Sequence, residues 1–132
     1  MRAADGKASV SLRADGIQYL QWLQGTTING QDARDVLETS FRLADQQPYA
    51  ILVDMTAISH QTLGAREAFN ADSRVIAAAL LGDGPMDEVL AGGAVKAVHP
   101  TAFFTSEKAA ISWLTAYVEA SSSAWSSDTD SA

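Results

Sequence analysis

Two histidines are the first residues whose chemistry could form a site. His60 and His99 both fall in connections near predicted strand ends, which is where open α/β sheets usually bind ligands. Together with Asp54 they could in principle hold a metal ion. The sequence has no H-x-x-H or H-E-x-x-H spacing and no carboxylate cluster, patterns typical of zinc sites. We therefore expect no metal, and we interpret both histidines as loop residues that are exposed or bonded locally.

The same region contains the residue types of a hydrolytic triad. Ser59 stands beside His60, and Asp54 lies shortly before them. A triad is, however, assembled from distant segments, and the G-x-S-x-G pattern of a nucleophile elbow is absent. Asp54 is explained by an Asx-turn that bonds the backbone of Thr56, with a functional role at the strand end as the alternative. We expect a protein without a catalytic site.

Glycine patterns that cradle phosphates are also missing. Neither G-x-G-x-x-G nor G-x-x-x-x-G-K-[ST] occurs, and these are the spacings with which helix N-termini and glycine loops bind nucleotides. Gly92-Gly93 follows a predicted helix instead of opening one. We expect no nucleotide and no other cofactor.

The elements that would position these residues begin with a hairpin. Residues 8–13 alternate between polar and apolar side chains, which is the period of a half-buried strand. Ala14-Asp15-Gly16 supplies a turn, and residues 17–22 form the returning strand. The chain is predicted to open with a β-hairpin.

Two apolar runs predict the middle of a sheet. Tyr49 to Val53, closed by Asp54, and Val75 to Leu81 lack polar alternation, as strands buried on both faces do. A further strand is predicted at residues 102–104. Helices are predicted at residues 30–45 after an Asn29 cap, at 63–72 after a Thr62 cap, at 86–91, and after Thr105 or Ser106.

The element order indicates one α/β domain. Strands that alternate with helices form a sheet with parallel neighbours, and the opening hairpin makes that sheet mixed. We predict about five strands and about four helices. A chain of 132 residues supports one core, which we place in residues 1–120. The Ser- and Asp-rich residues 121–132 are predicted to form a disordered tail.

The composition excludes several classes of partner. A net charge of −7 disfavours binding to nucleic acid and to anionic membrane surfaces, which need clustered Lys and Arg. The sequence contains no cysteine, so disulfides and thiolate metal sites are excluded. No signal-peptide pattern or membrane-spanning run occurs, and we expect a cytoplasmic protein.

Two short motifs carry a family resemblance. Leu52-Val53-Asp54-Met55-Thr56 before a capped helix, and the run FFTSEKAAISWL at residues 103–114, resemble the small bacterial proteins grouped with STAS/SpoIIAA-like domains. The resemblance covers most of residues 7–119. It implies a mixed, mostly parallel sheet flanked by helices, in agreement with the pattern above.

The resemblance also implies candidate regulatory residues. In the anti-sigma-factor antagonists of that superfamily, a serine in a D-S-S-G motif at a helix N-terminus is phosphorylated and switches partner binding. This chain has Gln61-Thr62-Leu63-Gly64 there, so Thr62 is the nearest hydroxyl and Ser59 the next. A phosphate at this helix N-terminus would be tolerated and would add about two negative charges to an interface.

Two functions remain open. The first is a non-catalytic regulatory or protein-interaction domain that binds an unknown protein partner, with a homodimer as one form, through the loops after Asp54 and Leu81. The second is a binder of a small apolar ligand or lipid, because the same arrangement resembles the Sec14-like domains. Small side chains in the alanine-rich strand and in residues 82–93 could leave room for such a ligand.

Overall fold

The computed structural model describes residues 1–83 and 97–131, and for Ser59 and residues 122–131 it describes the backbone alone. The elements in chain order are β1 (Arg2–Ala3), a 3₁₀ turn (Ala4–Gly6), β2 (Ala8–Leu12), β3 (Gln18–Trp22), β4 (Thr26–Ile28), α1 (Gly30–Leu43), β5 (Tyr49–Asp54), β6 (Ile58–Gln61), α2 (Leu63–Ala71), β7 (Val75–Leu81), β8 (Thr101–Phe104) and α4 (Glu107–Ser131).

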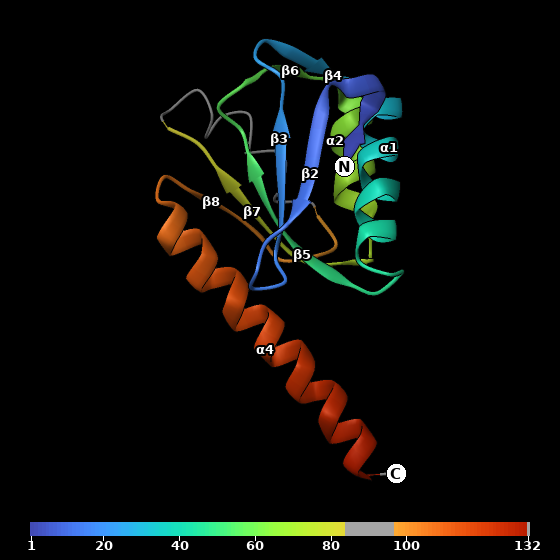
Figure 1. The fold of residues 1–132 in the computed structure, drawn as a ribbon, viewed down its shortest axis with the longest axis vertical. Helices are drawn as coiled ribbons and strands as arrows, with labels where there is room; N and C mark the ends of the chain where they lie inside the picture. The colour runs from blue at the N-terminus through green and yellow to red at the C-terminus, as the bar shows by residue number, and fades with distance from the viewer. Residues whose placement is uncertain (84–96, 132) are drawn as a thin grey trace.

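The main sheet has the order β1-β2-β3-β5-β7-β8 (Figure 1). The first three strands are antiparallel neighbours, and β3, β5, β7 and β8 are parallel neighbours. The predicted mixed, mostly parallel sheet is therefore confirmed. It has six strands instead of about five because β1, with two residues, is too short to leave a pattern in the sequence. A separate pair, β4 and β6, was missed for the same reason.

The opening hairpin is confirmed. Strands β2 and β3 pair antiparallel from Ala8 opposite Trp22 to Leu12 opposite Gln18. The backbone N–H of Arg13 donates to the Ile17 carbonyl across the turn. Gly16 adopts φ +85°, a left-handed conformation that closes such hairpin loops and that L side chains rarely adopt.

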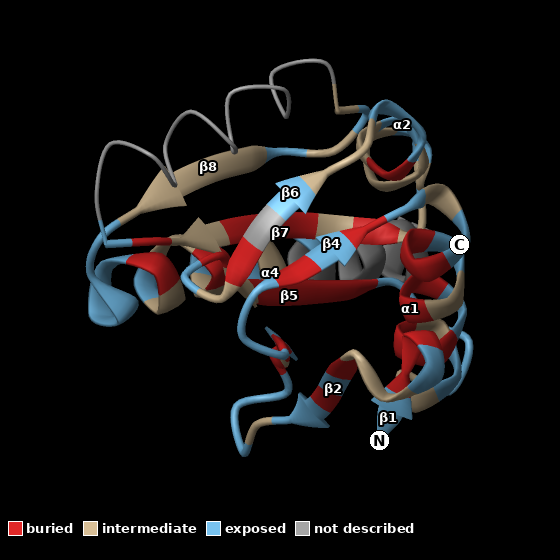
Figure 2. Ribbon diagram, turned by 90° about the horizontal axis from the view of Figure 1, so that it is seen from above, coloured by how far each residue is buried: buried red, intermediate tan, exposed pale blue. Residues whose placement is uncertain are grey.

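The two apolar runs lie side by side in the centre of the sheet. Strand β5 pairs with β7 in parallel, with Ile51 opposite Ala78 and Asp54 opposite Leu81. Figure 2 shows both strands, and the inward side of α1, as largely buried. Period-two geometry sends neighbouring residues to opposite faces. Accordingly, Ala78 joins one core cluster, whereas Ala77 and Ala79 join the other.

Three α-helices cover the sheet in the part of the chain that the structure describes, where about four were predicted. The short helix expected at residues 86–91 lies outside the described residues. Helices α1 and α2 lie on one face of the sheet and α4 on the other (Figure 1). We call these the α1/α2 face and the α4 face.

The predicted helix starts are confirmed by their caps. The Asn29 side chain accepts from the Asp32 N–H, and the Asp32 carboxylate accepts from the Asn29 N–H in return. Thr62 Oγ1 accepts from the Ala65 N–H at 3.1 Å and caps α2. For α4, Ser106 Oγ accepts from the Ala109 N–H at 3.2 Å, which identifies Ser106 as the capping residue.

Helices α1 and α2 approach closely at two glycines. A Cβ atom on Gly30 would lie 3.5 Å from the Gly64 carbonyl carbon and 3.2 Å from a guanidinium nitrogen of Arg34. The absence of side chains at these two positions lets the first turns of both helices touch. This contact fixes where α2 stands over the sheet.

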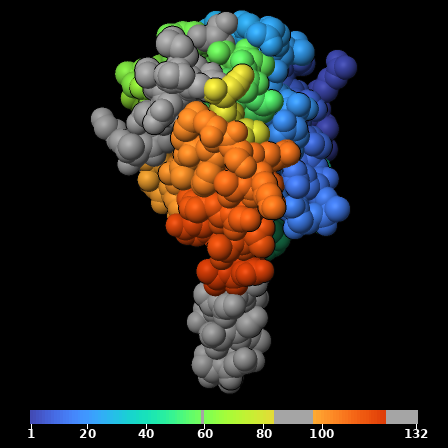
Figure 3. Space-filling view, turned by 90° about the vertical axis from the view of Figure 1, so that its left-hand side faces the viewer, coloured from blue at the N-terminus to red at the C-terminus, as the bar shows by residue number. Residues whose placement is uncertain are grey.

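Helix α4 packs its first half against β5, β7 and β8. In the space-filling view it forms the middle of the surface on this side (Figure 3). Its backbone is helical to Ser131, and the disordered tail at residues 121–132 stays a prediction. A composition rich in serine and aspartate indicates little apolar burial, and it does not distinguish a projecting helix from a disordered chain.

Candidate functional site

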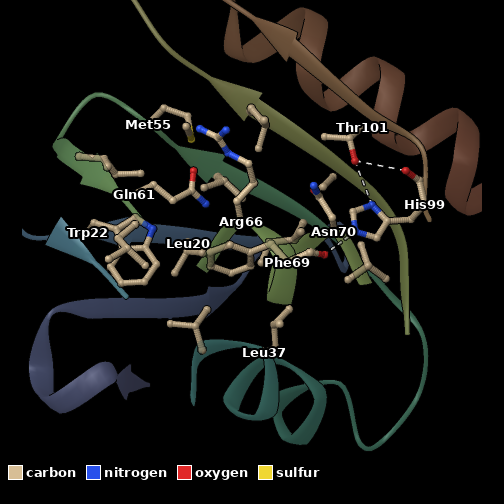
Figure 4. Close-up of a pocket in the computed structure, with 18 of the residues that line it drawn as sticks. Leu20, Trp22, Leu37, Met55, Gln61, Arg66, Phe69, Asn70, His99 and Thr101 are labelled. Carbon is tan, nitrogen blue, oxygen red and sulfur yellow. Dashed lines mark hydrogen bonds between the residues drawn. The ribbon is translucent and has the colours of Figure 1, made fainter. Parts of the chain in front are cut away.

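A cavity of about 80 Å³ lies inside the α1/α2 face (Figure 4). Strands β3, β5 and β7 supply its floor, and α1 and α2 supply its walls. The apolar side chains that line it, most of them buried, are Leu20, Trp22, Ile28, Val36, Leu37, Tyr49, Ile51, Val53, Met55, Ile58, Phe69, Val75, Ala78 and Leu80.

Five polar side chains among the described residues also line the cavity. They are Gln61, Arg66, Asn70, His99 and Thr101. Gln61 ends β6, Arg66 and Asn70 belong to α2, and the other two stand at the entrance to β8. A mostly apolar pocket with a few polar groups is the usual form of a small-molecule site.

Arg66 differs from an ordinary surface arginine. Its Nε atom is buried without a hydrogen-bond partner, and in the described part of the chain no carboxylate lies within ion-pair distance of its guanidinium. The residue as a whole is half-buried. In Figure 4 its side chain extends toward Met55 and Gln61, which line the same cavity. A buried donor without an acceptor costs about 1–3 kcal/mol, so this arrangement is not favourable for folding alone.

Among the sequence-predicted candidates whose side chains the structure describes, only His99 lines the cavity. Its Nε2 donates to the Phe69 carbonyl at 3.1 Å, and its Nδ1 lies 2.9 Å from the Thr101 hydroxyl. A carbonyl can only accept, so Nε2 carries a proton, and Nδ1 is hydrogen-bonded to the Thr101 hydroxyl. The Val98 N–H also donates to the Asn70 carbonyl. His99 and Val98 thus each satisfy one carbonyl at the end of α2 and tie that helix to the segment that leads into β8.

Asp54, His60 and Thr62 do not line the cavity. The Asp54 carboxylate accepts from the Thr56 N–H at 2.9 Å and from the Thr56 hydroxyl at 2.6 Å, so the predicted Asx-turn is present. The Tyr19 hydroxyl is 3.4 Å from the same carboxylate. Burial, and then the Asp54 charge, raises the pKa of Tyr19. These contacts are those of a turn at a strand end.

The predicted residues do not converge on one site. Ser59 and exposed His60 belong to β6, and Thr62 caps the start of α2, whereas His99 contacts its end. A helix of nine residues separates its ends by about 13 Å. In the described part of the chain, no group of three His, Asp or Glu side chains is arranged to hold a metal ion.

Arg74 shows what a satisfied arginine looks like in this protein. Its guanidinium bonds the Asp72 carboxylate at 2.6 and 3.0 Å, lies 3.4 Å from Glu38, and stacks 4.6 Å from the centre of the Phe41 ring. Burial acts to raise the pKa of Asp72, but hydrogen bonds from the Arg74 side chain and backbone lower it overall. Arg74 holds the turn between α2 and β7.

Arg66 was not singled out from the sequence, although a signal was present. It lies three residues before Phe69 on α2, and both line the cavity. The positions three and four residues away hold Thr62, Leu63, Phe69 and Asn70, none of which is a carboxylate. Arg66 therefore has no oppositely charged neighbour at helical spacing, which leaves its charge to solvent or to a group outside the helix.

Helices in the described part of the chain are too short or too polar to cross a lipid bilayer.

A solved structure shows which fold this domain has. This protein is similar to the crystal structure of an uncharacterized DUF3478-family protein with a SpoIIAA-like fold from Shewanella loihica PV-4. The TM-score is 0.58 at 15% identity, covering 81% of this chain and 91% of that one. The domain therefore has a SpoIIAA-like fold.

A protein of unknown function from Arthrobacter sp. FB24 is 35% identical over 81% of this chain and 98% of its own, with a TM-score of 0.34. No curated protein matches this sequence. The model of a domain family of unknown function, DUF7793, matches residues 10–118, and the chain therefore belongs to the DUF7793 family.

Proposed function

We propose that this domain binds a small apolar ligand in the cavity of the α1/α2 face and performs no chemistry on it. The observation that carries the proposal is the cavity itself, enclosed by buried side chains of the central strands and of α1 and α2. Protein interiors are normally close-packed. At about 24 cal/mol per Å³, a void of about 80 Å³ forgoes about 2 kcal/mol of stability.

The size of the cavity bounds the ligand. A single water needs about 10–15 Å³, and an apolar cavity of about 150 Å³ binds benzene. A cavity of about 80 Å³ therefore fits a short aliphatic chain and is smaller than the pockets of drug-sized ligands, at about 300–1,000 Å³. A longer lipid chain would require the lining side chains to move.

The hydrogen bonds that the candidate residues already make within the protein favour binding over catalysis. A general base needs a free ring nitrogen or carboxylate within reach of the substrate. Both ring nitrogens of His99 are engaged by Phe69 and Thr101. Asp54 and Thr62 are engaged in a turn and a helix cap away from the cavity.

A direct test is calorimetric titration with 1-hexanol, a neutral molecule with a short apolar chain. Wild-type protein should bind it saturably, and Ala78→Val should weaken binding at least about tenfold, because two added methyl groups project into the cavity. Ala79→Val adds the same groups on the opposite face of β7 and is the matched control. Equal binding by both variants, or no binding by the wild type, contradicts the proposal.

A protein-interaction role is the second candidate. Leu63, the first residue of α2, is 67% exposed and follows Thr62 in the chain. An exposed apolar side chain therefore lies next to the candidate regulatory hydroxyl. Such a surface would bind a protein partner or a second copy of the chain. Light scattering of the wild type, Leu63→Ser and Thr62→Glu tests the homodimer. A monomer at all concentrations rules that form out.

A further inference from the structure

We infer that the ligand of the α1/α2 cavity is a small amphipathic monocarboxylate whose charged group pairs with Arg66. This inference rests on the proposed function and specifies its ligand class. Its basis is the juxtaposition of two features: the buried Arg66 Nε has no hydrogen-bond partner among residues 1–83 and 97–131, and the other walls of the cavity are mostly apolar.

The geometry of the guanidinium favours a carboxylate. Arg pairs side-on with a carboxylate through Nε and one terminal nitrogen, which gives two parallel N–H···O bonds. Nε is the atom left without an acceptor here, so a carboxylate at this edge would satisfy it. The half-buried position of Arg66 leaves the charged group near solvent while the apolar chain enters the core.

The charges around the cavity limit the ligand to one negative charge. Arg66 is the only Lys or Arg among the described residues that line it, and the whole chain carries a net charge of −7. The long-range field therefore disfavours anions, and a dianion such as a phosphate monoester would keep an uncompensated charge. A monoanion matched by one guanidinium is the chemistry that fits.

Gln61 supplies a second polar group at the same end. It ends β6 and lines the cavity near Arg66 (Figure 4). A side-chain amide can donate to the outer carboxylate oxygen. His99 is held by Phe69 and Thr101, so it shapes the wall without offering a free donor.

The test compares three ligands of equal chain length. Hexanoate, 1-hexanol and hexylammonium are titrated calorimetrically into the full chain at pH 7 and constant ionic strength. Hexanoate should bind at least about tenfold more tightly than 1-hexanol, as expected for a charge-assisted bidentate pair. Hexylammonium should bind more weakly than either.

Variants of Arg66 test whether this residue causes the preference for hexanoate over 1-hexanol. Arg66→Met and Arg66→Gln should remove the hexanoate preference while leaving 1-hexanol binding within about twofold, and Arg66→Lys should restore part of it. Arg42→Met removes an exposed arginine of α1 and should change nothing.

The outcomes distinguish the proposed apolar site from the inference that its ligand is a carboxylate. If 1-hexanol binds and hexanoate binds no more tightly, the carboxylate inference is overturned and the apolar site stands. A preference that survives in both Arg66 variants overturns the assignment to Arg66. Failure of every ligand to bind the wild type overturns the site itself. The three wild-type titrations decide the ligand class even where a variant does not fold.

Discussion

The two faces of the central sheet are built from the same strands yet packed differently. On the α4 face, small Ala77 and Ala79 let α4 approach closely, and Ala110 and Leu114 on that helix are fully buried. Phe104, Trp113 and Tyr117 extend the contact, with successive ring centroids 5.5 and 4.8 Å apart. On the α1/α2 face, larger side chains surround a cavity and an arginine, Arg66, whose buried Nε has no hydrogen-bond partner among the described residues.

The two arginines of the α2 region repeat this contrast. Arg74, just beyond the helix, has carboxylates and an aromatic ring around it. Arg66, inside the helix, has a buried Nε for which the described part of the chain supplies no acceptor. The packing of the α4 face and the contacts of Arg74 are explained by their contribution to the stability of the fold. The cavity and Arg66 lower stability, and we attribute them to binding.

The largest expected effect is a truncation on the α4 face. Leu114→Ala should lower the free energy of unfolding by about 3–5 kcal/mol, because it opens a void in a closed core. Leu37→Ala, next to the existing cavity, should cost only about 2 kcal/mol since that side chain has fewer packing partners to lose. Urea unfolding measures both, and equal losses would remove the packing contrast.

The second-largest effect is expected when the ion pair between Asp72 and Arg74 is weakened. Asp72→Asn should lower stability by about 2 kcal/mol at pH 7, because it weakens the charged hydrogen bonds from Arg74. The pKa of Asp72 is lower in the folded state than its usual value. Its stabilisation is therefore complete above about pH 4–5 and is lost as the pH falls through the folded pKa.

The measurement is urea unfolding of the wild type and Asp72→Asn between pH 3 and pH 7. The difference between them should stay constant from pH 7 down to about pH 5 and should shrink as the pH falls further toward 3. A difference that is constant with pH would mean that Asp72 acts through packing instead of through its charge.

A smaller effect contrasts neighbouring alanines of β7. Ala79→Val should cost about 1–3 kcal/mol, because it overpacks the contact with α4. Ala78→Val should change stability by less than about 0.5 kcal/mol, since its added methyl groups enter the cavity and valine suits a strand. Thermal unfolding of both variants checks this pair. A large loss for Ala78→Val would mean that the cavity cannot accept even two methyl groups.

The smallest effect is expected at Asp54. Asp54→Ala removes the Asx-turn and should cost about 0.5–1 kcal/mol. It should also lower the pKa of Tyr19, which the Asp54 charge raises, although burial would keep that pKa above its usual value. An NMR titration of the tyrosine ring follows this shift. An unchanged pKa would show that the two groups do not interact.

Much of the fold could be predicted from periodicity and caps. The runs at residues 49–53 and 75–81, the Asp15-Gly16 turn, and the Asn29 and Thr62 caps all depend on interactions within a few residues. Strands β1, β4 and β6 could not be predicted, because they have two to four residues and owe their existence to partners that are distant in sequence.

The candidate site was harder to predict, because a cavity is a property of packing and not of any local pattern. Searching for catalytic residue types led only to His60, His99 and Asp54, for which we expected local roles. The structure places His99 at the cavity with both ring nitrogens occupied. Arg66 is unusual because its buried Nε has no hydrogen-bond partner among the described residues, and this can be seen only in the folded structure. Regulatory roles for Thr62 and Ser59 stay predictions.

The most direct test of the binding claim is methyl NMR of the wild-type protein during titration with hexanoate. We predict saturable shifts for methyl groups that line the cavity, those of Leu37, Ile51 and Ile58, and unchanged signals for Ile17 and Leu114 on the α4 face. Shifts of equal size on both faces, or no saturable shift at the cavity, would contradict the account.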